Sequence, residues 1–358
     1  MQTQSKFRLL VVRLGAMGDI LHALPAVTAL RMQHPYWVID WVVEPKWSAL
    51  LAAREAHGRD TASVQPLQPV IDKLHFAPAK EWGKSPLAGR TRREVLALRR
   101  ALREGDYDTA IDFQGAVRSA AFARMAGSRL IGETVPREWL ARWLFTEKIA
   151  TRGAHVIEQD FELAAAVAGD ALQPVRPWLP FDEKAEAWAC HLLASTPGRP
   201  TVLINPGAGW GAKRWPIERY AAVAQGLVAR GCRVLVNAGP GEESIADVLV
   251  KATLGAAAPL APSLENLIAL TRRVALVIAG DTGPLHLACA LGKPVVGIYG
   301  PTDPSRNGPF GTRSRVLRHP ASRRDHSRRQ APEAGLLTIQ PEEVLAATKE
   351  LLHDEATA

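Results

Sequence analysis

The sequence has few cysteines and no long apolar run, and both absences narrow the class of protein. Three cysteines, Cys190, Cys232 and Cys289, are widely separated among 358 residues and form no Cys-x-x-Cys pair. A disulfide framework or a zinc site is therefore not indicated, and we expect small buried side chains. No stretch of about 18 uninterrupted apolar residues occurs, which argues against a membrane-spanning helix. Arg8 and Arg13 interrupt the first apolar run, so we predict no signal peptide and a cytoplasmic location.

Acidic residues are too few to balance the basic ones. The chain has 44 Lys and Arg against 36 Asp and Glu, which gives a formal net charge of +8. This excess favours polyanionic partners such as lipid phosphate or nucleic acid. The sequence has neither an aromatic RNA-binding signature nor zinc-finger spacing, so no nucleic-acid partner is predicted. Arginines gather at 90–103 and 318–329. Such runs usually form solvated faces, with contact to a membrane surface as the alternative.

Apolar runs alternate with amphipathic stretches along the chain, which predicts an α/β fold with parallel sheets built from βαβ units. The first series has strands expected at 9–13, 37–43 and 109–113, and helices at 20–33, 92–103 and 116–126. The second has strands expected at 201–205, 233–238, 275–279 and 294–299. A proline-containing segment at 173–180 separates the two series. We therefore expect domains at 1–175 and 176–340, followed by a C-terminal helix and tail at 341–358.

The segment at 277–304, VIAGDTGPLHLACALGKPVVGIYGPTDP, is typical of an anion pocket in a parallel sheet. Its pattern predicts a strand, a glycine-rich turn, a short helix at 285–291 and a second strand. The first free amides of that helix would face a phosphate placed there, so a nucleotide diphosphate is the natural ligand. The alternative is that Asp281 caps the helix and the glycines only permit the turn.

A second glycine turn follows the first predicted strand, in RLGAMGD at 13–19. It matches the dinucleotide pattern G-x-G-x-x-G only loosely, because Arg13 replaces the first glycine. An NAD-dependent oxidoreductase therefore stays as an alternative from a different enzyme class. Asp19 would lie at the carboxyl end of the sheet, where a general base can accept a hydroxyl proton. Its alternative role is a helix cap worth roughly 1 kcal/mol. His22 should share a helix face with Asp19, in packing or in chemistry.

Together these motifs resemble glycosyltransferase family 9, the bacterial lipopolysaccharide heptosyltransferases, and within it the heptosyltransferase I branch. The resemblance covers nearly the whole chain and rests on RLGAMGDILHALPAV (13–27), YDTAIDFQGAVRSAAFARMAG (107–127), GAKRWPIERY (211–220) and the segment at 277–304. It implies a GT-B fold of two Rossmann-like domains with parallel sheets facing a central cleft, the acceptor on the N-terminal domain and ADP-heptose on the C-terminal one. The implied reaction is inverting transfer of heptose to a Kdo residue of the lipid A inner core, without metal or other cofactor, at the inner face of the inner membrane.

The resemblance also implies which residues act in catalysis and acceptor binding. Asp19 would deprotonate the attacking hydroxyl, and Lys213 would neutralise the departing diphosphate, a charge effect that is often the largest catalytic term. Gly18, Gln114 and Arg118 fall on the acceptor side, where a guanidinium suits phosphate and carboxylate groups. The alternatives are a solvated loop lysine at Lys213 and a surface arginine at Arg118.

The donor side of the implied site lies mainly in the family pattern D-T-G-x-x-H. That pattern falls on Asp281, Thr282, Gly283 and His286. Glu242 corresponds to a family glutamate that accepts hydrogen bonds from the ribose hydroxyls. The alternatives are that His286 is a satisfied core histidine, and that Glu242 or the glutamate after it favours a helix N-terminus.

Two departures from the family pattern leave the exact sugar open. The loop at 205–211 is unusually rich in glycine, and the basic loop at 319–334 has no assigned place. A heptosyltransferase II-like protein with another donor or acceptor would keep the same carboxylate, lysine and helix terminus. A noncatalytic nucleotide-sugar or polyanion-binding protein is a further alternative.

Overall fold

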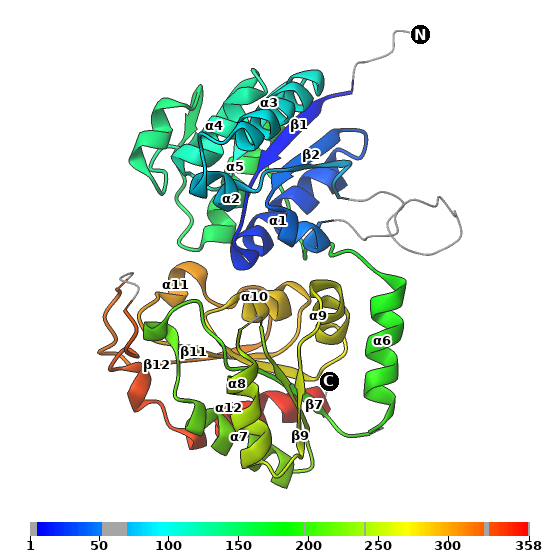
Figure 1. The fold of residues 1–358 in the computed structure, drawn as a ribbon, viewed down its shortest axis with the longest axis vertical. Coiled ribbons are helices and arrows are strands. Elements are labelled where there is room, and N and C mark those ends of the chain that lie inside the picture. The colour runs from blue at the N-terminus through cyan, green and yellow to red at the C-terminus, as the bar shows by residue number, and fades with distance from the viewer. Residues whose placement is uncertain (1–5, 52–69, 197, 240, 326–328, 357–358) are drawn as a thin grey trace. The chain divides into compact units, whose positions relative to one another are not determined.

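The computed structural model describes residues 6–51, 70–196, 198–239, 241–325 and 329–356, and the chain forms two compact units. The units are Met1–Pro180 and Phe181–Ala358, divided at the end of the proline-containing segment 173–180. That segment contains neither helix nor strand. Each unit has one parallel sheet of six strands with helices on both sides (Figure 1).

The first sheet has the order β3-β2-β1-β4-β5-β6. Its strands are β1 (Arg8–Val12), β2 (Val38–Val43), β3 (Lys73–Phe76), β4 (Thr109–Asp112), β5 (Arg129–Glu133) and β6 (Glu147–Ile149). From β1 the chain proceeds outward to β3, then returns to place β4 on the other side of β1. The register pairs Val12 with Asp112 at the carboxyl ends of β1 and β4. The strand order reverses between β1 and β4, and ligands of open α/β sheets bind at such a topological switch point.

The second sheet repeats this topology with the order β12-β11-β10-β7-β8-β9. Its strands are β7 (Thr201–Asn205), β8 (Arg233–Asn237), β9 (Ala257–Leu260), β10 (Leu276–Gly280), β11 (Val295–Tyr299) and β12 (Ser314–Arg318). The switch point lies between β7 and β10, where Asn205 pairs with Ala279. Both sheets therefore place two neighbouring strand ends where polar loops can meet.

The helices of the first unit form two layers. They are α1 (Met17–Gln33), α2 (Ala79–Lys84), α3 (Gly89–Glu104), α4 (Val117–Met125) and α5 (Val156–Ala168), with short 3-10 helices η1 (Pro45–Leu50) and η2 (Trp139–Trp143). Helix α1 packs against α5, and α3 packs against α4. Strand β1 lies between the layers, and its residues 9–12 are completely buried. Burial on both faces explains why β1 is an uninterrupted apolar run.

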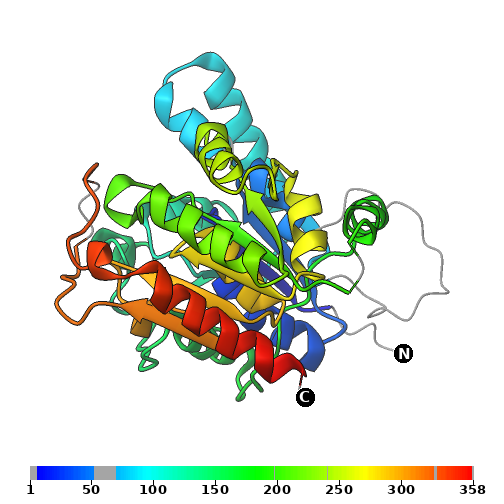
Figure 2. The same ribbon diagram turned by 90° about the horizontal axis from the view of Figure 1, so that it is seen from below.

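The second unit is layered in the same way. Its helices are α6 (Glu183–Ala194), α7 (Ile217–Ala229), α8 (Glu243–Ala252), α9 (Leu264–Thr271), α10 (Gly283–Ala290), α11 (Pro304–Asn307) and α12 (Pro341–Ala356), with η3 (Gly211–Lys213) and η4 (Leu336–Thr338). Helix α6 packs against α9, and the last helix, α12, lies beside α7 (Figure 2). Val344 and Leu351 of α12 are buried in the core of this unit. None of the helices within the described ranges is both long and apolar enough to cross a membrane.

The predicted strands all occur, and each end differs from its expected position by at most one residue. The pattern missed β5 and the four strands at the sheet edges, β3, β6, β9 and β12. Edge strands bury only part of their surface, so their apolar signal is weak; the burial pattern of β12 contains no fully buried residue. The expectation for the cysteines was wrong at Cys190, which is exposed on α6, whereas Cys232 and Cys289 are buried.

The layered packing predicts very different costs for truncation in central and edge strands. Ile278 of β10 is fully buried, so Ile278→Ala should lower the free energy of unfolding by about 2 to 5 kcal/mol. Val316 of edge strand β12 is 38% exposed, and Val316→Ala should cost less than about 1 kcal/mol. Urea unfolding followed by circular dichroism measures both. Equal costs would contradict this arrangement of the second sheet.

Candidate active site

The loops after β1 and β4 are joined by side-chain hydrogen bonds. Gln114 Oε1 accepts from the backbone N–H of Leu14 at 2.9 Å. Asp112 holds the second loop, because its carboxylate accepts from the N–H of Gln114 at 2.8 Å and from the Ser119 hydroxyl at 2.9 Å. Burial raises the pKa of Asp112 to about 6, although these hydrogen bonds act in the opposite direction. Gln114 thus lies at the switch point, held by both loops.

Asp19 lies in the first turn of α1, at the third helical position and not at the N-cap, which is Ala16. Its Oδ2 accepts from the N–H of Ala16 at 2.9 Å, and its Oδ1 is 3.1 Å from Arg13 Nη2. The Asp19 side chain is still 35% exposed. The carboxylate therefore stabilises the helix start and remains open to a substrate. Gly18, the residue before it, is half-buried in the same turn.

Arg13 connects the two loops and is a candidate site residue whose role the sequence did not reveal. Its side chain is 8% exposed, donates to the backbone oxygen of Phe113 and pairs with Asp19. The Trp41 indole N–H donates to the Arg13 carbonyl at 3.0 Å. The residue that breaks the dinucleotide pattern thus places a cation beside the exposed carboxylate.

Asp160 of α5 is a second residue that the sequence pattern missed. It is 2% exposed, and its Oδ2 has no hydrogen-bond partner among the described residues. Burial raises the pKa of Asp160 to about 8; the charge of Arg13 counteracts this, and the charges of Asp19 and Glu133 add to it. Asp160 is therefore protonated and neutral at neutral pH. It does not compete with Asp19 for the positive charge of Arg13.

The remaining predicted residues of this unit, Arg118 and His22, each contact another part of the unit. Arg118 is exposed on α4, and its Nη1 donates to the carbonyl of Ala79 at 3.3 Å. His22 is 5% exposed, and its ring packs edge-on against His155 with 5.7 Å between centroids. The contact with His155 favours the packing interpretation of His22.

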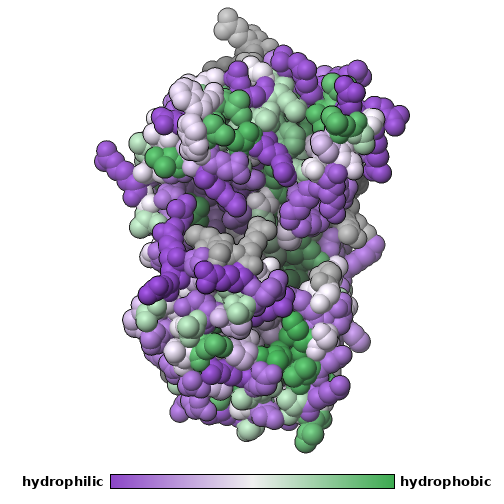
Figure 3. Space-filling model, turned by 60° about the vertical axis from the view of Figure 1, so that its left-hand side comes forward, coloured by the Kyte–Doolittle hydropathy of each residue, from purple (hydrophilic) through white to green (hydrophobic). Residues whose placement is uncertain are grey.

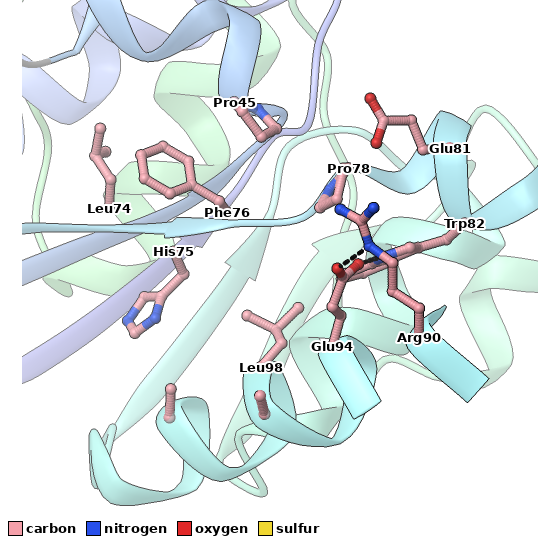
Figure 4. Close-up of a pocket in the computed structure, with 12 residues that line it drawn as sticks. Pro45, Leu74, His75, Phe76, Pro78, Glu81, Trp82, Arg90, Glu94 and Leu98 are labelled. Carbon is pink, nitrogen blue, oxygen red and sulfur yellow. Dashed lines mark hydrogen bonds and ion pairs between the residues drawn. The ribbon is translucent and has the colours of Figure 1, made fainter. Parts of the chain in front are cut away.

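A pocket of about 500 Å³ lies beside β3, between α2 and α3 (Figure 4). Phe76, Trp82 and Leu98 contribute to its apolar wall. Glu94 accepts from the Trp82 indole N–H at 2.8 Å and from Arg90 Nε at 2.7 Å (Figure 4). None of the predicted site residues lines this pocket.

In the second unit, three predicted residues meet after β7 and β10. The Lys213 ammonium, on η3, pairs with the carboxylate of Asp281 and donates to its backbone oxygen at 3.3 Å. His286 Nε2, on α10, lies 3.1 Å from Asp281 Oδ1. Lys213 Nζ also lies 4.2 Å from the centroid of the Trp210 ring. The cluster is nearly enclosed, since the side chains of Lys213 and Asp281 are 11% and 5% exposed.

The electrostatic state of Asp281 follows from these partners. Burial by itself would raise its pKa, but the hydrogen bond with His286 and the charges of His286 and Lys213 outweigh burial and lower the pKa of Asp281. The carboxylate stays ionised and holds Lys213 in place. The capping interpretation of Asp281 is wrong, because Thr282 occupies the N-cap position.

The start of α10 is left without a side-chain cap. The Thr282 side chain makes no cap hydrogen bond; its hydroxyl donates to the carbonyl of Gly280 at 3.2 Å. Asn205 Nδ2 lies 3.4 Å from that hydroxyl oxygen, and Asn237 Nδ2 donates to Asn205 Oδ1 at 2.6 Å. The helix itself begins at Gly283. Side chains at the ends of β7 and β8 and after β10 thus surround a helix N-terminus, which carries a partial positive charge.

The two adjacent glutamates have different surroundings. Glu242 Oε2 accepts from the N–H of Gly239 at 3.0 Å, and a Cβ at Gly207 would come within 2.1 Å of the same oxygen. Glu243 is exposed and accepts from the N–H of Gly241 at 3.1 Å. Only Glu242 therefore packs against the loop after β7. Although Glu242 is the N-cap residue of α8, its side chain makes no cap hydrogen bond.

Part of the basic loop at 319–334 is fixed against the turn that carries Lys213. The N–H of Ala212 donates to the carbonyl of Arg329 at 2.9 Å, and the N–H of Glu333 donates to the carbonyl of Ala212 at 3.1 Å. A Cβ at Gly211 would come within 1.8 Å of the Gln330 carbonyl oxygen. The glycine-rich turn and the basic loop thus pack together; residues 326–328 lie outside the described part of the chain.

The two groups of residues suit different chemistry. The partly exposed Asp19 carboxylate is able to accept a proton, and the lysine beside the start of α10 is able to bind an anion. Within the ranges that the structure describes, no three His, Cys, Asp or Glu side chains are grouped to hold a metal ion.

Two parallel sheets of identical strand order, each with polar residues at its switch point, place the protein among glycosyltransferases of the GT-B class. A sequence model of glycosyltransferase family 9 (heptosyltransferase) matches residues 95–336. The chain belongs to this family.

Individual relatives agree with this assignment. The chain is 30% identical to lipopolysaccharide heptosyltransferase 1 of Escherichia coli (strain K12), over 87% of this chain and 94% of that protein. It is 25% identical to lipopolysaccharide heptosyltransferase 2 of the same strain, over 97% and 99%. The solved structure "E. coli heptosyltransferase WaaC with ADP" is 26% identical and covers 96% of this chain and 100% of that chain, with a TM-score of 0.77. The NAD-dependent oxidoreductase alternative is therefore set aside.

The state of Asp160 predicts how stability depends on pH. The folded protein keeps this proton up to about pH 8, whereas an unfolded Asp releases it near pH 4. The unfolded state binds fewer protons in that window, so Asp160 makes stability fall as the pH rises through it. Asn does not titrate, so Asp160→Asn should gain stability over wild type between pH 5 and pH 8, by at most about 4 kcal/mol.

Urea unfolding at several pH values measures this gain. Asp247→Asn is the matched control, because Asp247 is exposed on α8. A constant difference between Asp160→Asn and wild type across the pH range would contradict a protonated Asp160.

Proposed function

We propose that this protein transfers heptose from ADP-heptose to a Kdo residue of the lipid A inner core, in lipopolysaccharide biosynthesis. The observation that carries the proposal is the position of Lys213, held by ionised Asp281 beside the uncapped start of α10. The names of the relatives, lipopolysaccharide heptosyltransferases and a structure with ADP, support the choice of donor and pathway.

The residues on the donor side suit a diphosphate leaving group that gains negative charge during the reaction. As the bond between the sugar and the diphosphate breaks, negative charge develops on the leaving oxygen. Lys213, the Thr282 hydroxyl and the first amides of α10, which begins at Gly283, would meet that charge. Groups fixed in place before the reaction stabilise the transition state more than the ground state. In this proposal Asp281 and His286 orient Lys213 and the turn.

The nucleoside end of the donor would lie near Glu242. Its carboxylate is held by the N–H of Gly239 and lies against Gly207, beside the polar ends of β7 and β8. Carboxylate oxygens accept hydrogen bonds from vicinal hydroxyls such as those of ribose. Glu243, whose side chain is exposed and bonded to Gly241, has no such surroundings.

Asp19 is the proposed general base. The acceptor hydroxyl gives its proton to the partly exposed Asp19 carboxylate while its oxygen bonds to the anomeric carbon. The bond from that carbon to the diphosphate oxygen breaks at the same time, which releases ADP and inverts the configuration. Arg13 and the N–H of Ala16 fix the orientation of the carboxylate. Protonated Asp160 leaves Arg13 to this task.

The acceptor would bind beside Gly18, Gln114 and Arg118. The Arg118 guanidinium is exposed and suits the carboxylate of Kdo or a lipid A phosphate. An acceptor attached to lipid would place the protein in the cytoplasm, peripherally on the inner face of the inner membrane. No metal or other cofactor is needed in this scheme, because Lys213 and the helix start supply the positive charge.

Transfer from ADP-heptose to Kdo2-lipid A, assayed with EDTA present and read by mass spectrometry, tests the proposal. We expect product from wild type, and a rate at least about 10²-fold lower from Asp19→Asn, since a general base contributes about 10² to 10⁴. Asn still accepts from the N–H of Ala16, so thermal melts should show a folded variant. Asp247→Asn should keep the wild-type rate.

Each other result has a definite meaning. A rate from Asp19→Asn equal to that of wild type would show that Asp19 stabilises the helix start and is not the general base. Absence of product from wild type would reject this donor and acceptor pair. The similarity to heptosyltransferase 2 makes a heptosylated acceptor the next to assay.

The ribose contact predicts a difference between two glycines of one loop. A Cβ at Gly207 would displace the Glu242 carboxylate, whereas a Cβ at Gly209 meets no atom within 4 Å. We expect Gly207→Ala to weaken ADP binding at least about tenfold, and Gly209→Ala to leave it unchanged. Calorimetric titration with ADP measures both. Equal affinities of the two variants for ADP would show that Glu242 does not contact the donor.

A further inference from the structure

The first unit exposes an apolar patch around η2 that packing within the unit does not explain. Large apolar residues of a folded protein are rarely exposed together without a function. We name this patch the aromatic edge. It consists of the exposed residues Val117, Val135, Trp139, Leu140 and Trp143. Trp139 and Trp143 are 63% and 72% exposed. Figure 3 shows one face of the molecule, on which hydrophobic residues lie scattered among hydrophilic ones.

The tryptophans are held outward by a fixed backbone. Ala141 and Phe145, on the opposite side of the segment, are buried in the core of the unit. Glu138 fastens the segment to the start of α4, because its N–H donates to the Gly115 carbonyl at 2.8 Å and its Oε2 accepts from the N–H of Val117 at 2.9 Å. Exposure of the indole rings is therefore a property of the folded unit.

Cationic side chains accompany the aromatic edge. Arg118, Arg137 and Arg142 are all exposed, and the Arg142 guanidinium lies 5.9 Å from the centroid of the Trp143 ring. The acidic residue of the segment, Glu138, uses a carboxylate oxygen on the N–H of Val117. Tryptophan beside arginine is the combination that favours the boundary between lipid headgroups and acyl chains.

The aromatic edge begins at the carboxyl edge of the first sheet, where Glu138 is bonded to the loop after β4. Val135 follows β5, which ends at Glu133, and Val117 follows β4; in a parallel sheet these carboxyl ends lie at one edge. Beyond η2 the chain returns to the amino end of β5, where the N–H of Thr146 donates to the Leu130 carbonyl at 2.9 Å. Asp19 and Gln114 follow β1 and β4 at that same edge. The start of the patch, at Val117 and Val135, is thus on the side of the unit that carries the proposed acceptor residues.

We infer that the aromatic edge docks the protein on an anionic bilayer surface, with Trp139 and Trp143 inserted at headgroup level and Arg142 on lipid phosphate. The inference rests on the proposed function in one respect, namely that the acceptor is borne by lipid. A second copy of the chain fits this surface less well, because a symmetric contact would bring the arginines of both copies together, whereas anionic lipid neutralises them.

Vesicle flotation of the full chain tests the docking surface. Wild type should bind vesicles of phosphatidylcholine and phosphatidylglycerol, and bind phosphatidylcholine alone more weakly. The double variant Trp139→Ser/Trp143→Ser should lose at least about tenfold in partition. The matched control is Leu87→Ser/Leu96→Ser, which removes two other exposed apolar side chains. Leu87 precedes the arginine-rich α3 and Leu96 lies within it, and this variant should bind like wild type. Arg142→Glu should weaken binding to the anionic vesicles only, and it keeps the test open if the tryptophan variant unfolds.

Three results would overturn the inference. The first is wild type that does not bind anionic vesicles. The second is a folded tryptophan variant that binds as well as wild type, or a leucine variant that alone loses binding, which would move docking to α3. The third is a dimer in light scattering that Trp139→Ser/Trp143→Ser converts to monomer, which would assign the aromatic edge to a second copy.

A transfer assay with two acceptors separates this inference from the proposed function. The tryptophan variant should keep the wild-type rate with a deacylated, water-soluble Kdo acceptor and lose rate with the acceptor in vesicles. Equal rates of variant and wild type on the vesicle-borne acceptor would count against docking. If wild type transfers heptose to neither acceptor, the proposed function fails, and flotation still decides the docking surface.

Discussion

Burial of the central strands on both faces is the constraint on which the rest of this structure depends. Strands such as β1, β7 and β10 lie between two layers of helices, so their side chains are apolar and their backbone groups are satisfied by neighbouring strands. Charged groups have no place along such strands and emerge where the strands end. The order shared by both sheets brings two strand ends together at each switch point. The candidate site residues of each unit follow from that geometry.

The two units use buried carboxyl groups in opposite ways. In the first unit Asp160 has no hydrogen-bond partner for Oδ2 among the described residues, and burial dominates its pKa. It is neutral, and Arg13 is left to the exposed Asp19. In the second unit Asp281 is also buried but has Lys213 and His286 as partners, so it is ionised. The same type of side chain therefore serves as a neutral neighbour in one place and as the anchor of a cation in the other.

Close backbone approach explains the glycine-rich loop after β7. Gly207 leaves space for the Glu242 carboxylate, and Gly211 leaves space for the Gln330 carbonyl. The basic loop, which has no evident place in the sequence pattern, thereby supports the turn that carries Lys213.

The tryptophans have two contrasting environments. Trp41 is fully buried and donates to the Arg13 carbonyl, whereas Trp139 and Trp143 are exposed to solvent.

The sequence by itself determined the α/β class, the predicted central strands to within one residue, and the two glycine turns, because continuous apolar runs and turn residues are local signals. It also indicated the residues of the candidate site through motifs. Only the tertiary structure decided that Asp281 pairs with Lys213 and does not cap α10, that Asp160 is neutral, and that the edge strands join their sheets. Each of these depends on groups far apart in the chain, and charge, burial and strand pairing act through space, where no local pattern records them.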